Sequence, residues 1–191
     1  MPSLATLDGS ALSLFKFDYA KQAAKNKKLG IAKFRLDGAP FKITVDATVV
    51  TNGISVAEFG TGSSKKTVYS LGLTPNEEAD LTALSTIAES LRQYVPEDLR
   101  DDFEIVDSVK DDRFYLKLPA SDDKKSFKLH SNIPLNPKKT QDSGIEADQE
   151  LSVTVELGAY FNFEDKKAGL MITPTSIDFA QEDHTTKKMK L

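Results

Sequence analysis

Apolar and polar residues alternate along much of this chain, and a two-residue period is typical of half-buried β-strands. In residues 41–51, FKITVDATVVT, the odd positions from 41 to 49 are apolar and the even positions from 42 to 48 are polar. One face of this strand is therefore predicted to pack in a core. Comparable runs predict further strands at residues 30–38, 54–60, 67–73, 113–118, 125–130, 150–163 and 169–179.

Turn-forming residues separate these runs. Residues 37–40 (DGAP) predict a turn after the first strand. Asn52-Gly53 predicts a tight hairpin that joins residues 41–51 to 54–60, because both residues tolerate a positive φ. Residues 60–66 (GTGSSKK) predict a flexible loop between two strands. A phosphate-binding loop leads into a helix instead, so no nucleotide site is expected there.

One helix with a clear apolar stripe is predicted in the middle of the chain. Residues 74–77 (TPNE) have the spacing of a capping box, with proline at the first helical position. Pro96 ends the helix. A short helix is also predicted within residues 11–28, ending near Gly30. The stripe, which would pack against the sheet, consists of Leu81, Leu84, Ile87, Leu91 and Tyr94.

Long loops complete the predicted organisation. Residues 97–112 are acidic and predict a short helix or a loop, and the polar residues 131–149 predict an exposed loop. The sum is a mainly β fold with one inserted α-helix and long loops. We expect a basic N-terminal segment at residues 1–29, a single β-barrel domain at 30–180 and a flexible tail at 181–191.

Charge is distributed unevenly along the 191 residues, whose net charge is −4. Residues 1–36 carry seven basic and two acidic residues, which is +5 and leaves −9 for the remainder. A local excess of positive charge on an acidic protein is typical of a segment that binds nucleic acid. A solvated basic helix is the alternative interpretation.

No motif typical of an enzyme is present. The sequence has no cysteine and no GxxxxGK(S/T), GxGxxG, GxSxG or HExxH motif. The acidic pairs at residues 101–102, 111–112 and 122–123 lack EF-hand spacing. We therefore expect no enzyme activity, no cofactor and no metal. The absence of cysteine favours a reducing, intracellular compartment. No apolar run reaches the length of a membrane span, so no membrane partner is expected.

Basic residues on the predicted strands and loops are candidate phosphate contacts. In residues 33–35 (KFR), strand alternation places the two cations on one face and Phe34 on the other. Proteins that bind single-stranded nucleic acid combine a positive groove with aromatic rings on which bases stack. The candidate phosphate contacts are Lys33, Arg35, Lys42, Lys65 and Lys66, helped by the basic residues 21–28.

Aromatic residues gather near the end of the predicted strand at 150–163. Its alternation places Phe161 and Phe163 on the core side and leaves Tyr160 free to stack, unless a bulge at residues 158–159 switches the faces. Core packing is the alternative role for each ring. The candidate stacking residues are Tyr160 first, then Phe34, Phe161 and Phe163.

The order of these elements resembles that of the OB-fold single-stranded DNA-binding proteins of tailed phages and large DNA viruses. The segments that carry the resemblance are FRLDGAPFKITVDATVV (34–50), YSLGLTPNEEADLTALSTIAESL (69–91) and VTVELGAYFNFEDKKAGLMITPTSIDF (153–179). The resemblance implies an OB-like β-barrel with a helix inserted in it. Many phage members end in an acidic tail with a terminal aromatic that contacts replication partners. This chain ends DHTTKKMKL, so recruitment through the tail is not implied.

Together these features predict a non-enzymatic protein that coats single-stranded DNA in replication, recombination or repair, in a phage- or virus-infected cell. Its expected partners are single-stranded DNA and other replication or recombination proteins, and a homo-oligomer is left open. A structural β-sandwich protein of a virion or its assembly is the alternative. An enzyme whose acidic pairs hold a metal is a third and weaker hypothesis.

Overall fold

Five strands form the body of the molecule. The computed structural model describes residues 12–51, 53–140 and 144–180. The strands pair antiparallel in the order β9-β6-β4-β10-β11. Strands β9 and β11, at the two ends of this order, are in contact, but no backbone ladder joins them in the described residues. We call this unpaired junction the β9–β11 seam. The five strands are β4 (Lys42–Val49), β6 (Lys66–Pro75), β9 (Arg113–Leu118), β10 (Glu150–Asn162) and β11 (Lys167–Phe179).

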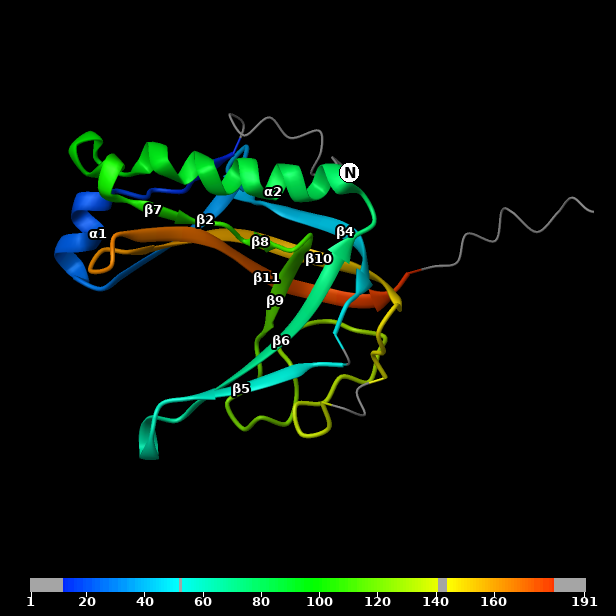
Figure 1. Ribbon diagram of the computed structural model, residues 1–191. Helices are drawn as coiled ribbons and strands as arrows, with labels where there is room; N and C mark the ends of the chain where they lie inside the picture. Colours follow the sequence, from blue (N-terminus) through cyan, green and yellow to red (C-terminus); the bar gives the residue numbers. More distant parts are fainter. Residues whose placement is uncertain (1–11, 52, 141–143, 181–191) are drawn as a thin grey trace, which may run out of the picture.

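Six further strands extend this barrel. Residues 150–156 of β10 pair with β4, and residues 158–162 pair with β2 on the same edge. Strand β5 pairs with the first half of β6, and this two-stranded ribbon projects from the barrel (Figure 1). Strand β7 runs parallel to β11. The further strands are β1 (Ser13–Leu14), β2 (Leu29–Leu36), β3 (Ala39–Pro40), β5 (Ser55–Phe59), β7 (Glu104–Val106) and β8 (Val109–Lys110).

The main helix is inserted between β6 and β9. Helix α2 spans Glu78–Ser90, continues as a 3₁₀ turn at Leu91–Tyr94, and lies along one side of the barrel (Figure 1). The predicted stripe from Leu81 to Leu91 is buried in the core, and Tyr94 packs against it. A shorter helix, α1, spans Tyr19–Lys25. A partly open, five-stranded barrel is the architecture of an OB-fold. The predicted mainly β, OB-like class with an inserted helix and long loops is confirmed.

Two local predictions about pairing are wrong. Residues 54–60 do not return against β4, because β5 pairs with β6 instead, across the predicted loop at 60–66. Residues 125–130 form no strand and make isolated bridges at Phe127 and His130. The alternation there reflects a loop in which Phe127 is buried against Tyr69.

The predicted capping box is also wrong. Strand β6 runs on to Pro75, and the helix begins after Glu77, whose side chain makes no capping hydrogen bond. The backbone amide of Asn76 instead donates to the carbonyl of Asp46, at 2.9 Å. Sheet pairing at residues 74–75 therefore overrides the local helix-start signal.

Strand β10 keeps one face in the core along its whole length. Every odd position from 151 to 161 is buried. No bulge interrupts residues 158–159; the register against β11 shifts instead between Thr154 and Val155, where β11 carries the extra residue Thr175. Phe161 therefore faces the core and Tyr160 the outer face, as the alternation predicts.

The segment before β2 packs on the end of β10. The Phe17 ring stacks on Phe161 with centroids 4.3 Å apart, and Tyr19 meets Phe163 edge-on at 4.9 Å. Leu12 and Leu14 are buried in the same core. The division of the chain into a basic segment, a barrel domain and a tail stays a prediction, and residues 181–191 lie outside the described residues.

Gly158 allows β2 to lie close to β10, and its replacement tests this packing. A Cβ at position 158 would lie 2.8 Å from the backbone carbonyl oxygen of Ala32, which cannot rotate away. We expect Gly158→Ala to lower the free energy of unfolding by about 1–3 kcal/mol, as overpacking does. A Gly→Ala change without such a clash stabilises by about 0.4–1 kcal/mol. Urea unfolding of both proteins measures the difference, and a stabilised variant would contradict the close approach.

Candidate functional site

Two adjoining cavities lie along the β9–β11 seam. One has a volume of about 490 Å³ and is lined by Lys65 and the first residues of β6, by the end of β9 and the loop after it, and by Thr173 of β11. The other, of about 260 Å³, is lined by residues 106–108 at the end of β7 and after it, by β9 and β11, and by Tyr160 of β10. Lys117 of β9 and Thr173 of β11 line both cavities. We treat the two cavities, which share these lining residues, as one candidate site and call them together the seam groove.

Two tyrosines line the smaller cavity, and each lies over a glycine of the neighbouring strand. A Cβ at Gly169 of β11 would meet the Tyr160 ring at 2.9 Å. A Cβ at Gly72 of β6 would meet a ring carbon of Tyr115 at 3.0 Å. Both tyrosines line the same cavity, from opposite sides of the seam. Because neither glycine has a side chain, each tyrosine ring can lie against the backbone of the neighbouring strand at the edge of the groove.

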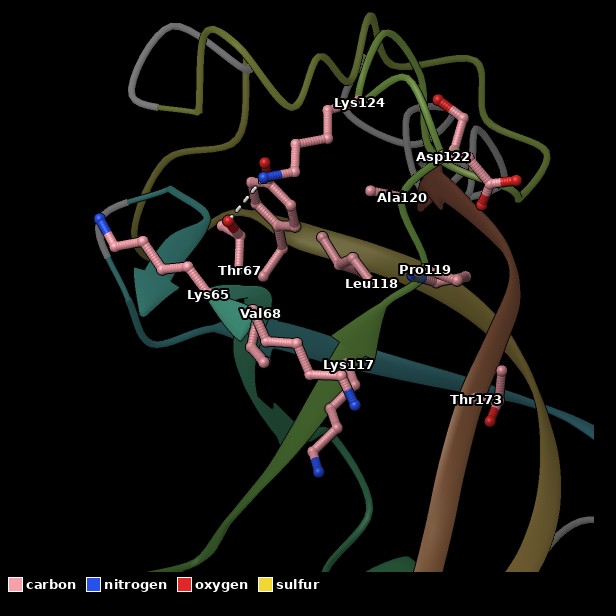
Figure 2. Close-up of a pocket in the computed structure, with 13 residues that line it drawn as sticks. Lys65, Thr67, Val68, Lys117, Leu118, Pro119, Ala120, Asp122, Lys124 and Thr173 are labelled. Atoms are coloured by element: carbon pink, nitrogen blue, oxygen red, sulfur yellow. Dashed lines mark hydrogen bonds between the residues drawn. The ribbon is translucent and has the colours of Figure 1, made fainter. Parts of the chain in front are cut away.

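Four lysines line the larger cavity, and they differ in their partners (Figure 2). Lys65 is paired with Glu58, and Lys124 donates to the hydroxyl of Thr67 at 2.9 Å. In the described part of the chain, neither Lys66 nor Lys117 forms an ion pair or a side-chain hydrogen bond. These two ammonium groups are available to an anion.

Lys66 and Lys117 share the outer face of β6 and β9 with Tyr115. Lys117 is paired across the strands with Ser70, and Tyr115 with Gly72, so all four point the same way. At the tip of the ribbon, Lys66 is paired with Phe59, which is 59% exposed. Two cations and two exposed rings therefore share one face between the ribbon and the seam.

The sequence-predicted residues divide between this groove and its surroundings. Lys65, Lys66 and Tyr160 line the groove. Lys33 of β2 and Lys42 of β4 lie on the adjoining outer face. Both are paired with the carboxylate of Glu156 on β10, at 3.0 and 3.4 Å.

Arg35 belongs to a separate cluster near the N-terminal segment. Its guanidinium lies 3.7 Å from the centroid of the Phe15 ring and donates to the carbonyl of Gly38 at 2.7 Å. Lys16 lies over the same ring at 5.0 Å. Arg35 does not line either cavity of the groove.

Three predicted aromatics pack in or against the core. Phe34 and Phe161 are 1% and 0% exposed. Phe163 is partly buried against Tyr19. Buried rings offer no free face to a base, so we leave Phe34 and Phe161 out of the candidate site. Phe163 points away from the outer face that carries Tyr160.

Sequence reasoning missed three residues of the groove: Tyr115, Lys117 and Lys124. The signal for the first two was present, because RFYLKL at 113–118 alternates and its odd positions are Arg113, Tyr115 and Lys117. Such alternation predicts a polar face with one ring between two cations. No sequence signal brings Lys124 to the groove, since a loop places it there.

Burial and charge set the ionisation of two groups beside the groove. Burial raises the pKa of the Tyr160 phenol above its ordinary value, so the ring is neutral at neutral pH. The hydrogen bond from Lys33 holds the pKa of Glu156 below its ordinary value, with Lys42 adding to the effect. The outer face therefore has an ionised carboxylate between two ammonium groups.

Within the described residues, no group of three His, Cys, Asp or Glu side chains could hold a metal ion. The same part of the chain contains no helix with the length and apolar character needed to cross a membrane. Neither observation changes the candidate site.

Comparison with known proteins gives a weak structural likeness and no match by sequence. No family model and no curated protein matches the sequence. Among solved structures, the chain is similar to gp2.5, a single-stranded DNA-binding protein encoded by bacteriophage T7, with a TM-score of 0.43 and 12% identity. The match covers 78% of this chain and 97% of that one. A likeness of this size carries no argument about the site.

Glu156 makes the stability of the fold depend on pH. Folding lowers its pKa below 4.5, so its contribution is present above that value and is lost as the pH falls through the folded pKa. Glu156→Gln should therefore destabilise the protein more at about pH 7 than at about pH 3, because protonation of the wild-type carboxyl increases as the pH falls. Urea unfolding of both proteins at the two pH values checks this. An equal difference at both would contradict the ion pairs.

Proposed function

We propose that this protein binds single-stranded DNA in the seam groove and does so without catalysis. The observation that carries the proposal concerns the lining of the groove. Tyr115 and Tyr160 line one of its two cavities, and Lys66 and Lys117, which have no side-chain partner in the described residues, line the other. Rings on a sheet beside free cations are the elements that single-strand binders use. The ammonium groups would contact phosphates, and the tyrosines would stack on bases.

Single strands are preferred over duplex in this proposal because only unpaired bases expose their faces to a ring. Base selectivity is expected to be weak, since every base has a π-face. Four lysines and two aspartates, Asp107 and Asp122, line the groove, so the groove itself is positively charged although the remainder of the chain is acidic.

The wider role we propose is to coat exposed single strands during replication, recombination or repair, with other proteins of those processes as partners. The setting in a phage- or virus-infected cell rests on the resemblance in the sequence. A structural β-sandwich role remains the alternative, and no contact in the groove favours it.

The test is the binding of a fluorescent oligo-dT of about 30 nucleotides, followed by anisotropy over a range of salt. Each lysine–phosphate contact on a single strand contributes about 0.7 to the slope of log affinity against log salt. Lys66→Gln/Lys117→Gln should therefore reduce the slope by about 1.4 and weaken binding at every salt concentration. Unlabelled duplex should compete poorly.

Lys138→Gln/Lys139→Gln is the matched control. These two lysines are exposed, and they lie in the loop at residues 131–149 and do not line the groove. The control removes the same charge and should leave the slope almost unchanged. Absence of binding at low salt would refute the proposed function. Equal losses in the two double variants would show that net charge, and not the groove, governs binding.

A further inference from the structure

The outer face beside the groove contains an acid that nothing in the proposed function requires. Glu156 lies on β10, directly across from Lys42 on β4 and from Thr173 on β11. Thr173 lines both cavities of the seam groove. The carboxylate is therefore one strand away from the proposed path of the DNA.

We propose that Glu156 acts as a built-in competitor of the DNA backbone: it occupies Lys33 and Lys42 and thereby limits the affinity of the groove for phosphate. This inference rests on the proposed function. It assigns Glu156 a tuning role and extends the DNA contact surface from the seam to β2 and β4.

The geometry supports competition between the carboxylate and phosphate. Lys33 donates to one carboxylate oxygen of Glu156 at 3.0 Å, and Lys42 lies 3.4 Å from the other oxygen. A single carboxylate thus holds two ammonium groups in the way that two oxygens of a phosphate would. The three side chains come from three adjacent strands, so the sheet fixes their separation.

The exposure of these side chains shows which of them a ligand can reach. The side chains of Lys33 and Lys42 are 69% and 52% exposed, whereas that of Glu156 is 21% exposed. The lysines can swing toward solvent, but the acid stays within the sheet surface. The two lysines and the carboxylate together carry a net charge of +1, whereas the two lysines alone would carry +2. An approaching phosphate is therefore attracted less strongly, and the carboxylate repels it.

The cross-strand pairing of Lys33 also places it close to the groove. Lys33 is paired across the strands with Gly158, which is paired with Met171 of β11. Met171 lines the cavity that contains Tyr115 and Tyr160. Because Gly158 has no side chain, nothing on β10 rises between Lys33 and the groove.

Glu156→Gln tests the inference by removing the charge and keeping the shape. Two freed lysines would add two phosphate contacts, which steepens the salt slope for oligo-dT by up to about 1.4. The ratio of the two dissociation constants should then change about 25-fold per tenfold change in salt, with the variant binding more tightly at low salt. Melting temperatures confirm that both proteins are folded, and Glu156→Thr, which suits a strand, replaces Glu156→Gln if the latter does not fold.

Two controls separate local from general effects. Glu89→Gln removes the same charge from α2, where Glu89 is paired with Arg92 at 3.5 Å and does not line either cavity. It should leave the slope almost unchanged. Lys33→Gln/Lys42→Gln should weaken binding in the wild-type background, because it leaves the Glu156 carboxylate without its two partners beside the groove. In the Glu156→Gln background it should abolish the gain.

The outcomes distinguish this inference from the proposed function. A wild type that binds oligo-dT, with a Glu156→Gln variant of equal slope or weaker binding, would overturn the competitor role and leave the groove in place. A gain in Glu89→Gln as large as that in Glu156→Gln would also overturn it. Failure of the wild type itself to bind would refute the proposed function.

Discussion

The pairing of β10 with three strands is the constraint on which the rest of the structure depends. One edge of β10 pairs with β11 along its length, and the other pairs with β4 and then with β2. Because the alternation of β10 is unbroken, its odd positions fill the core while Glu156 and Tyr160 are held on the outer face. A one-residue slip would bury Tyr160 and expose Phe161. The core and the candidate site are thus two faces of one strand.

The barrel is left open at the place where the groove forms. The short strands β8 and β7 pair with one end of β9 and of β11, but no backbone ladder in the described residues joins β9 to β11 themselves, although the two are in contact. Beside the junction, the missing side chain of Gly72 leaves room for the Tyr115 ring, and that of Gly169 leaves room for the Tyr160 ring. The lysines here differ in availability: Lys66 and Lys117 are unpaired in the described residues, while Lys33 and Lys42 are held by Glu156. Local pairing, more than the net charge of −4, decides where an anion can bind.

The sequence was informative where periodicity alone decides the outcome. Alternation predicted β4, β9, β10 and β11, and helical spacing predicted α2, because each of these elements buries one continuous face. It failed where long-range pairing decides: β5 pairs with β6 and not with β4, and β6 extends through the expected capping box. For the site, Tyr160, Lys65 and Lys66 were named in advance. Tyr115 and Lys117 were missed because β9 was not known to border the seam, and the loop that brings Lys124 there has no periodic signal.

Photo-crosslinking tests the central claim, that a single strand lies along the β9–β11 seam, most directly. The probe is an oligo-dT that carries 5-iododeoxyuridine, irradiated in complex with the protein, and mass spectrometry identifies the linked residues. The account predicts links at Tyr115 and Tyr160, the two rings that line the groove. Links concentrated at Phe15, beside Arg35, or on α2 would place the strand elsewhere and contradict the account.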